Sequence, residues 1–174
     1  MVLFLILMLI FVFLMFLTVF VNFYLMVPFA PSNRHATQAM IQAVPLKPTD
    51  IVYELGSGDG RLAFALNKTY GCAVVGFELA PLIFLWAQLV KLLKRSPKVT
   101  FLMKNFLSSD LNHADYLYCY LTPGMLDKLA KKIETDHCHA TIISHSFAIH
   151  HWKPFEIIPK DITQKTPVIY IYKT

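Results

Sequence analysis

The sequence predicts an α/β fold, in which a seven-stranded, mostly parallel sheet ends in a C-terminal antiparallel hairpin and is preceded by one transmembrane helix. Short apolar runs alternate with longer helical patterns, a glycine-rich loop follows the first of these runs, and the excess of apolar residues lies at the amino terminus. The chain of 174 residues is 56% hydrophobic and 16% charged, yet the part beyond residue 30 has the composition of an ordinary globular domain. This distribution excludes a disordered chain, a coiled coil and a polytopic membrane protein.

The amino-terminal segment is expected to cross a membrane. Residues 1–27 contain no charged side chain and are interrupted only by Thr18 and Asn22. About 20 helical residues are enough to cross a hydrocarbon core of ~30 Å. A cleaved signal peptide would have a basic start and a small-residue cleavage site, and this segment has no basic start. We therefore expect a transmembrane helix over 1–27, a linker with a short helix over 28–48, and one domain over 49–174.

The charges around this helix predict its orientation. No basic residue precedes it, whereas Arg34 and Lys47 follow it, so the positive-inside bias places the domain in the cytoplasm, at the inner membrane if the cell is bacterial. The net charge of +5 lies entirely beyond residue 30, in clusters that suit either anionic headgroups or solvated helix ends. The three cysteines have no CxxC spacing and are expected to be reduced core thiols, which favours an intracellular domain.

The remaining chain divides into strands and helices. Five apolar runs rich in Val, Ile, Phe and Tyr are apolar on both faces, as parallel strands are, and helical patterns separate most of them. Two further runs follow these five near the carboxyl terminus. They have no room for a helix between them and must pair as an antiparallel hairpin. Strands are expected at 51–55, 73–78, 99–103, 116–120, 140–147, 155–158 and 168–172, and helices at 34–44, 61–68, 81–94 and 123–135.

A glycine loop with the sequence Glu-Leu-Gly-Ser-Gly-Asp-Gly-Arg follows the first strand at 54–61 and opens the first helix of the domain. In an open parallel sheet this is where a ligand crevice lies, and alternating glycines permit tight turns and close approach of a ligand to the backbone. Glu78 ends the second strand, 22 residues after Gly56, where a carboxylate can bind a ribose diol. The loop therefore predicts a nucleoside-containing cofactor, with a purely structural turn as the alternative.

Two classes of cofactor share this geometry. A nicotinamide site with GxGxxG spacing would need a third glycine at position 61, where this chain has Arg61. The acids Glu54 and Asp59 suit a ligand with an ammonium group and a sulfonium better than they suit a pyrophosphate. The loop thus favours the sulfonium-bearing class.

Further segments carry a resemblance to a known family. They are Phe-Glu-Leu-Ala-Pro at 77–81, Tyr-Leu-Thr-Pro at 120–123, and Ile-Ser-His-Ser-Phe at 143–147 running into Trp-Lys-Pro at 152–154. With the glycine loop, they make residues 31–154 resemble class I S-adenosylmethionine-dependent methyltransferases. Within these, the chain resembles the small membrane-anchored protein-lysine methyltransferases related to the mitochondrial enzymes that modify the ATP synthase and the adenine nucleotide translocase. The resemblance implies a Rossmann-like fold and S-adenosyl-L-methionine as cofactor.

The resemblance also assigns the cofactor site. It implies that the glycine loop holds the methionine end of the cofactor, that Glu78 accepts hydrogen bonds from the ribose hydroxyls, and that Asn105 contacts the adenine where the family usually has aspartate. The implied cofactor-binding residues are Glu54, Gly56, Ser57, Gly58, Asp59, Gly60, Glu78 and Asn105.

The acceptor site is expected at the ends of the fourth and fifth strands. Our hypothesis is that Tyr120 and Thr122 orient the acceptor amine, beside Pro123. His145 is expected at the far wall with Ser144 and Trp152, either as a general base or as an ordinary polar residue. No metal is expected, because the near-adjacent His137, Cys138 and His139 lack a fourth tetrahedral ligand in register.

The leading functional hypothesis is a membrane-anchored protein-lysine N-methyltransferase that acts on a membrane protein. The alternatives are a methyltransferase for a lipid or lipophilic small molecule, and a catalytically inactive membrane scaffold. Nucleic-acid binding is not expected, because the basic residues are not interleaved with aromatic ones and a base-methylation motif is missing.

The helix at 81–94 begins with an almost continuously apolar run, so it is expected to be buried between layers, with a membrane-facing position as the alternative.

Overall fold

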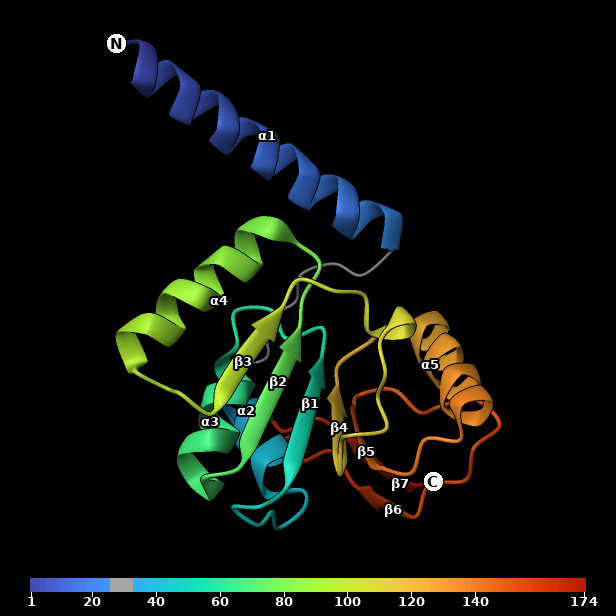
Figure 1. The fold of residues 1–174 in the computed structure, drawn as a ribbon. Coiled ribbons are helices and arrows are strands. Elements are labelled where there is room, and N and C mark those ends of the chain that lie inside the picture. Colours follow the sequence, from blue (N-terminus) through green and yellow to red (C-terminus); the bar gives the residue numbers. More distant parts are fainter. Residues whose placement is uncertain (26–32) are drawn as a thin grey trace.

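The computed structural model describes residues 1–25 and 33–174, with side chains described for 1–20 and 33–174. The end of the expected transmembrane helix and the start of the expected linker fall on 26–32, outside the described residues. Beyond this gap, the chain forms one sheet with helices on both faces (Figure 1).

The sheet has seven strands in the order β3-β2-β1-β4-β5-β7-β6. The first five strands along the chain are parallel, and β7 is antiparallel to both β5 and β6. This arrangement confirms the predicted sheet and its closing hairpin. The strands are β1 (Ile51–Leu55), β2 (Ala73–Phe77), β3 (Val99–Leu102), β4 (Tyr116–Cys119), β5 (Thr141–His145), β6 (Glu156–Ile158) and β7 (Ile169–Lys173).

Two hydrophobic cores, one on each face of the sheet, hold the three layers together. On one face, buried residues of α2, α3 and α4 pack against strand residues such as Val52 and Val74. On the other face, α5 and η1 pack against residues such as Leu55 and Leu117. The helices that follow the amino-terminal α1 (Val2–Leu25) are α2 (Arg34–Gln42), α3 (Arg61–Tyr70), α4 (Pro81–Lys94), η1 (Phe106–Ser108) and α5 (Pro123–Asp136).

Local sequence signals explain most boundaries. Pro81 and Pro123 occupy the first turn of α4 and α5, as predicted, because that position needs no intrahelical N–H donor. The strand expected at 140–147 ends at His145, because Ser146 adopts a left-handed φ of 68° that no strand can continue. The short helix η1 was not predicted. Cys72, Cys119 and Cys138 are all buried and unpaired, as expected.

The predicted burial of α4 is wrong. Ala87 faces the sheet, but the opposite side of α4 exposes large apolar side chains. The sheet covers only the inner half of the helix, and α1 crosses only its amino-terminal end (Figure 1). Within α1, Val2–Phe20 is long and apolar enough to cross a membrane. The large exposed apolar residues of α4 are Leu85, Trp86, Leu89, Leu92 and Leu93.

Candidate active site

The glycine loop connects the carboxyl end of β1 to α3. The backbone amides of Gly56 and Ser57 donate hydrogen bonds to the carbonyl oxygen of Phe77, at 3.0 and 2.9 Å, so the loop is tied to the end of β2. Gly56, Gly58 and Gly60 adopt φ values of 78°, 56° and 76°, a left-handed conformation that favours glycine. The loop therefore presents bare backbone at the carboxyl edge of the sheet.

Gly60 is required for packing as well as for its dihedral angle. A Cβ atom at this position would lie 2.3 Å from Cζ of Phe101, inside its van der Waals radius. Gly76 on β2 is similarly restricted, since its Cβ would lie 2.7 Å from Phe101 Cδ1 and from Ser57 Cβ. The loop therefore packs tightly against β2 and β3 on its inner side. Ser57 Oγ is buried there and has no hydrogen-bond partner among the described residues.

Glu78 lies beside the loop at the end of β2. Its Oε2 accepts a hydrogen bond from the amide of Gly58 at 2.9 Å, and its Oε1 accepts one from the amide of Ala80 at 2.7 Å. Each carboxylate oxygen keeps a further lone pair for a ligand hydroxyl. The predicted ribose-binding carboxylate is therefore held next to the predicted cofactor loop.

Glu54, the first acid of the glycine-loop segment, contacts the start of α3, and its predicted role toward the cofactor stays a prediction. It is buried, and its Oε2 accepts a hydrogen bond from the amide of Ala63 in the first turn of α3, at 3.1 Å. Burial raises the pKa of Glu54 well above its usual value, and the charges of Asp59 and Glu78 raise it further. Glu54 thus helps to hold the amino-terminal end of α3.

Asp59 is paired with Arg61. Partial burial acts to raise the pKa of Asp59, but hydrogen bonds and charge from Arg61 lower it below its usual value, so the carboxylate is ionised. Arg61 Nη2 lies 2.6 Å from Asp59 Oδ2, and Arg61 Nε lies 3.0 Å from Oδ1. Sequence reasoning treated Arg61 only as a break in the nicotinamide pattern.

Asn105 lines a cavity of about 490 Å³ at the ends of β2 and β3, together with Phe77 and Leu102. Its Oδ1 accepts a hydrogen bond from the amide of Leu107 at 2.9 Å and so caps η1. Phe77 immediately precedes Glu78, which places this cavity next to the predicted ribose site. The position fits the adenine end of the cofactor, although Asn105 Oδ1 is already engaged.

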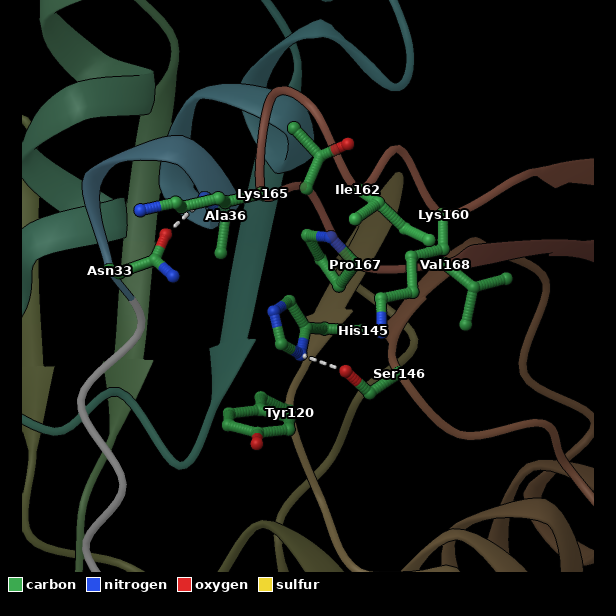
Figure 2. Close-up of a pocket in the computed structure, with 11 residues that line it drawn as sticks. Asn33, Ala36, Tyr120, His145, Ser146, Lys160, Ile162, Lys165, Pro167 and Val168 are labelled. Carbon is green, nitrogen blue, oxygen red and sulfur yellow. Dashed lines mark hydrogen bonds between the residues drawn. The ribbon is translucent and has the colours of Figure 1, made fainter.

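A second cavity, of about 770 Å³, lies at the ends of β4 and β5 and contains Tyr120 and His145 (Figure 2). The two rings contact each other edge to face, with centroids 4.0 Å apart. Ser146 Oγ lies 2.9 Å from His145 Nδ1, in hydrogen-bonding contact. Two of the four predicted catalytic residues are therefore neighbours in one cavity.

His145 is neutral at pH 7. Burial lowers its pKa to about 4, because the charged imidazolium loses solvation. Its Nε2 is buried and has no hydrogen-bond partner among the described residues. Whether Nε2 donates or accepts depends on the tautomer, because Ser146 Oγ can either donate to Nδ1 or accept from it.

Thr122 and Pro123 do not line this cavity. They begin α5, where the carbonyl oxygen of Thr122 accepts hydrogen bonds from the amides of Met125 and Leu126, both at 3.0 Å. The loop that carries them nevertheless adjoins the cofactor loop, because Leu121 Cδ2 lies 3.6 Å from the position of a Cβ on Gly56. The roles of Thr122 and Pro123 stay predictions.

Trp152 lies elsewhere. Its Nε1 donates a hydrogen bond to Glu134 Oε1 at 2.8 Å, and it lines a separate cavity with His137, Cys138 and His139. The expectation that it forms the far wall of the acceptor site is wrong, because Trp152 lines this separate cavity and not the one that contains Tyr120 and His145. In the described part of the chain, no group of three or more His, Cys, Asp or Glu residues is arranged to hold a metal ion.

The wall of the Tyr120 cavity comes from residues that sequence reasoning missed. They belong to the start of α2 and to the segment between β6 and β7, far apart along the chain and from β4. The periodicity of apolar residues along the chain does not predict contacts between segments that are so far apart in sequence. The missed residues that line the cavity include Asn33, Ala36, Lys160, Ile162, Lys165 and Pro167.

Comparisons with known proteins identify the family and relatives of this chain. Residues 54–156, more than half of the chain, match the family described as ANTKMT methyltransferase domain. A protein-lysine N-methyltransferase from Saccharolobus islandicus is 27% identical over 84% of this chain and 92% of its own length. The adenine nucleotide translocase lysine N-methyltransferase of Mus musculus is 24% identical over 77% of this chain, which spans 59% of that protein.

Solved structures show the same fold. An RNA methyltransferase from Salinibacter ruber, in complex with S-adenosyl-L-homocysteine, superposes with a TM-score of 0.73 at 24% identity and covers 83% of this chain and 93% of its own. An S-adenosylmethionine-dependent methyltransferase from Geobacter sulfurreducens, also with S-adenosyl-L-homocysteine, has a TM-score of 0.55 at 19% identity over 73% of this chain and 51% of its own. The predicted Rossmann-like methyltransferase fold is thereby confirmed, and the extent of the family match shows that this chain belongs to the ANTKMT methyltransferase domain family.

Proposed function

We propose that this protein is a membrane-anchored, S-adenosyl-L-methionine-dependent protein-lysine N-methyltransferase that acts on a membrane protein. The observation that carries the proposal is the position of the cofactor loop next to the Tyr120–His145 cavity, with Leu121 against Gly56 between them. The lysine methyltransferases among the relatives support the acceptor class. The apolar helix α1 supports the anchor.

The residues at the carboxyl edge of the sheet fit the cofactor. The bare loop backbone and the ionised Asp59 suit its amino-acid end, Glu78 suits the ribose diol, and the cavity beside Asn105 suits the adenine. When bound, the cofactor supplies a methyl group on a positively charged sulfur. The protein then has to hold the acceptor in line and keep water out.

The Tyr120 cavity suits an amine acceptor. A lysine must lose its proton before it can accept a methyl group, and the nearby positive charges of Lys160 and Lys165 favour the neutral form of an acceptor amine in this cavity. A neutral His145 adds no further positive charge to a cavity that Lys160 and Lys165 also line. The Tyr120 hydroxyl is the polar group that orients the amine in this proposal, and His145 packs against the Tyr120 ring.

The anchor explains why a small domain could work on a membrane acceptor. A tether confines the enzyme near the surface and raises the effective concentration of acceptors within its reach. Arg34 and Lys47, which follow α1, support the placement of the domain on the cytoplasmic side.

The test uses membranes that contain the full-length protein and methyl-tritiated S-adenosyl-L-methionine, followed by separation of protein from lipid. Asp59→Ala and Glu78→Ala should abolish incorporation, whereas Glu156→Ala, on the exposed strand β6, should leave it unchanged. Label in a protein band that yields methyl-lysine supports the proposal. Label in the lipid fraction alone identifies a lipid methyltransferase instead, and no label together with no cofactor binding identifies an inactive scaffold.

A further inference from the structure

We propose that the outer face of α4 lies in the headgroup region of the same bilayer that α1 enters, and that it holds the carboxyl edge of the sheet against the membrane. This inference rests on the anchor in the proposed function. The outer face of α4 is defined by Leu85, Trp86, Leu89, Leu92 and Leu93.

These side chains form one continuous stripe. Their spacings of three, four and seven residues put them on the same side of a helix. Trp86, Leu92 and Leu93 are 57%, 73% and 74% exposed, although α4 is a long helix of a folded domain. A contiguous exposed apolar surface of this kind marks an interaction site.

A contact between α1 and α4 places the stripe beside the expected transmembrane helix. Thr18 of α1 accepts a hydrogen bond through its Oγ1 from the amide of Leu82, at 3.2 Å. Leu82 is the second residue of α4, and its amide has no partner within the helix. The residue before α4, Ala80, supplies no side-chain cap. Thr18 therefore caps α4 from another helix, and the two helices meet at a defined point (Figure 1).

This point lies in the carboxyl-terminal part of α1. The described apolar span Val2–Phe20 has a length of about 28 Å, enough to match a hydrocarbon core of ~30 Å, and α1 continues to Leu25. Thr18 is seven residues, about 10 Å, before the end of α1. Helix α4 therefore begins beside the part of α1 that leads from the membrane to the domain.

The charges of α4 complement an anionic lipid surface. Lys91 and Lys94 lie in the last turn of α4, on the sides of the helix away from the apolar stripe, and Arg95 follows the helix. Lys94 places its Nζ 4.5 Å from the ring centroid of Phe64 on α3. Basic residues at the end of a helix whose exposed face carries leucines and a tryptophan are compatible with binding to an anionic membrane surface.

A membrane-bound α4 would also orient the active site. Strands β1, β2 and β3 point their carboxyl ends toward the side of the molecule where α1 lies (Figure 1). The glycine loop and Glu78 lie at those ends. Docking of α4 therefore turns the cofactor site toward the bilayer, where a lysine at the membrane surface can reach it.

The test places an environment-sensitive fluorophore on single introduced cysteines of the full-length protein in nanodiscs that contain anionic lipid. The native cysteines are buried, so labelling favours the introduced site. Labels go on α4 (Leu89→Cys and Leu92→Cys), on α1 (Ile10→Cys) and, as a matched exposed control, on β6 (Ile157→Cys). The proposal expects a shift to shorter wavelength and quenching by nitroxide lipids at 10, 89 and 92, and neither at 157.

Three outcomes overturn the proposal. Quenching at 10 without quenching at 89 and 92 removes the docking of α4 and leaves the anchor in place. Absence of quenching at position 10 contradicts both the docking of α4 and the membrane anchor. A shift at 89 and 92 that lipid nitroxides do not quench assigns the face to a protein partner or a second copy.

A pair of variants tests the functional consequence. The double substitution Leu89→Glu and Leu92→Glu should reduce methylation in membranes severalfold, with cofactor affinity unchanged, because it repels the outer face from the headgroups. Ile157→Glu puts one such charge on a surface of similar exposure outside α4 and should retain full methylation. Unchanged methylation by the double variant would overturn the proposed orientation.

Discussion

Glu78 Oε2 accepts a hydrogen bond from the backbone amide of Gly58, 2.9 Å away, although 20 residues separate them in the chain. The same carboxylate thus shapes the glycine loop and stands ready for the cofactor. Glu78→Gln keeps the size of the side chain but replaces one acceptor oxygen with a donor, which would face the amide of Gly58 or that of Ala80.

We expect Glu78→Gln to weaken cofactor binding about 10- to 100-fold, since a hydrogen bond to a charged group contributes about 1.5–3 kcal/mol. Isothermal titration with S-adenosyl-L-homocysteine measures this. Glu156→Gln, on exposed β6, is the control and should bind normally. Equal Kd values for the two variants would show that Glu78 has no part in cofactor binding.

Gly60→Ala should disrupt the glycine loop. The new methyl group would lie 2.3 Å from Phe101 Cζ, and the residue would have to keep a φ of 76°. We expect loss of cofactor binding and a fall of about 1–3 kcal/mol in the free energy of unfolding. Gly124→Ala is the matched control, because a Cβ there meets nothing within 4 Å and alanine favours the helix. Denaturant unfolding compares the two, and an equally stable Gly60→Ala variant would contradict the packing argument.

Tyr120→Phe tests the acceptor site. If the hydroxyl orients the amine, its removal should lower kcat about tenfold, the equivalent of one hydrogen bond, without changing the Kd of the cofactor. Tyr170→Phe, on β7 and outside the cavity, is the control. Single-turnover methylation in membranes gives the rate, and an unaltered rate would leave only the ring of Tyr120 with a role.

His145 should make the folded protein less stable in acid. Its folded pKa of about 4 lies below the usual value of 6.5, so the unfolded chain binds the proton first as the pH falls. The contribution to stability is therefore fully present above pH 6.5 and is lost as the pH falls toward 4, by about 3 kcal/mol in total.

The measurement is thermal unfolding in detergent between pH 7 and pH 4, for the wild type and His145→Gln. The carboxyl groups titrate in both proteins, so their effects cancel in the difference between the two profiles. We expect a steeper loss of stability for the wild type. Parallel profiles would show that His145 titrates normally in the folded protein.

Much of the fold follows from local patterns along the chain. The order of strands and helices, the parallel sheet and the closing hairpin were predicted from apolar periodicity, turn residues and helix-starting prolines. The cofactor loop was predicted in the same way, because its tight turn requires glycine at Gly56, Gly58 and Gly60 and these glycines can be read directly from the sequence. The pairing of Glu78 with this loop followed from its spacing after Gly56.

Contacts between distant segments were not predictable in this way. Trp152 was placed in the acceptor site, whereas it packs near Tyr172 and donates to Glu134. The cavity wall from the segment between β6 and β7 was missed altogether. In both cases the outcome depends on where a turn directs the chain, and no short window of sequence contains that information.

The sequence by itself determined which segments form strands and helices, where the cofactor loop lies and that an apolar helix begins the chain. These properties depend on neighbours along the chain, through dihedral preference and periodicity. Only the tertiary structure decided that α4 exposes its leucines, that Thr18 caps it, and that Tyr120 meets His145. Burial depends on what lies opposite a surface, and an apolar helix has the same sequence whether protein or lipid covers it.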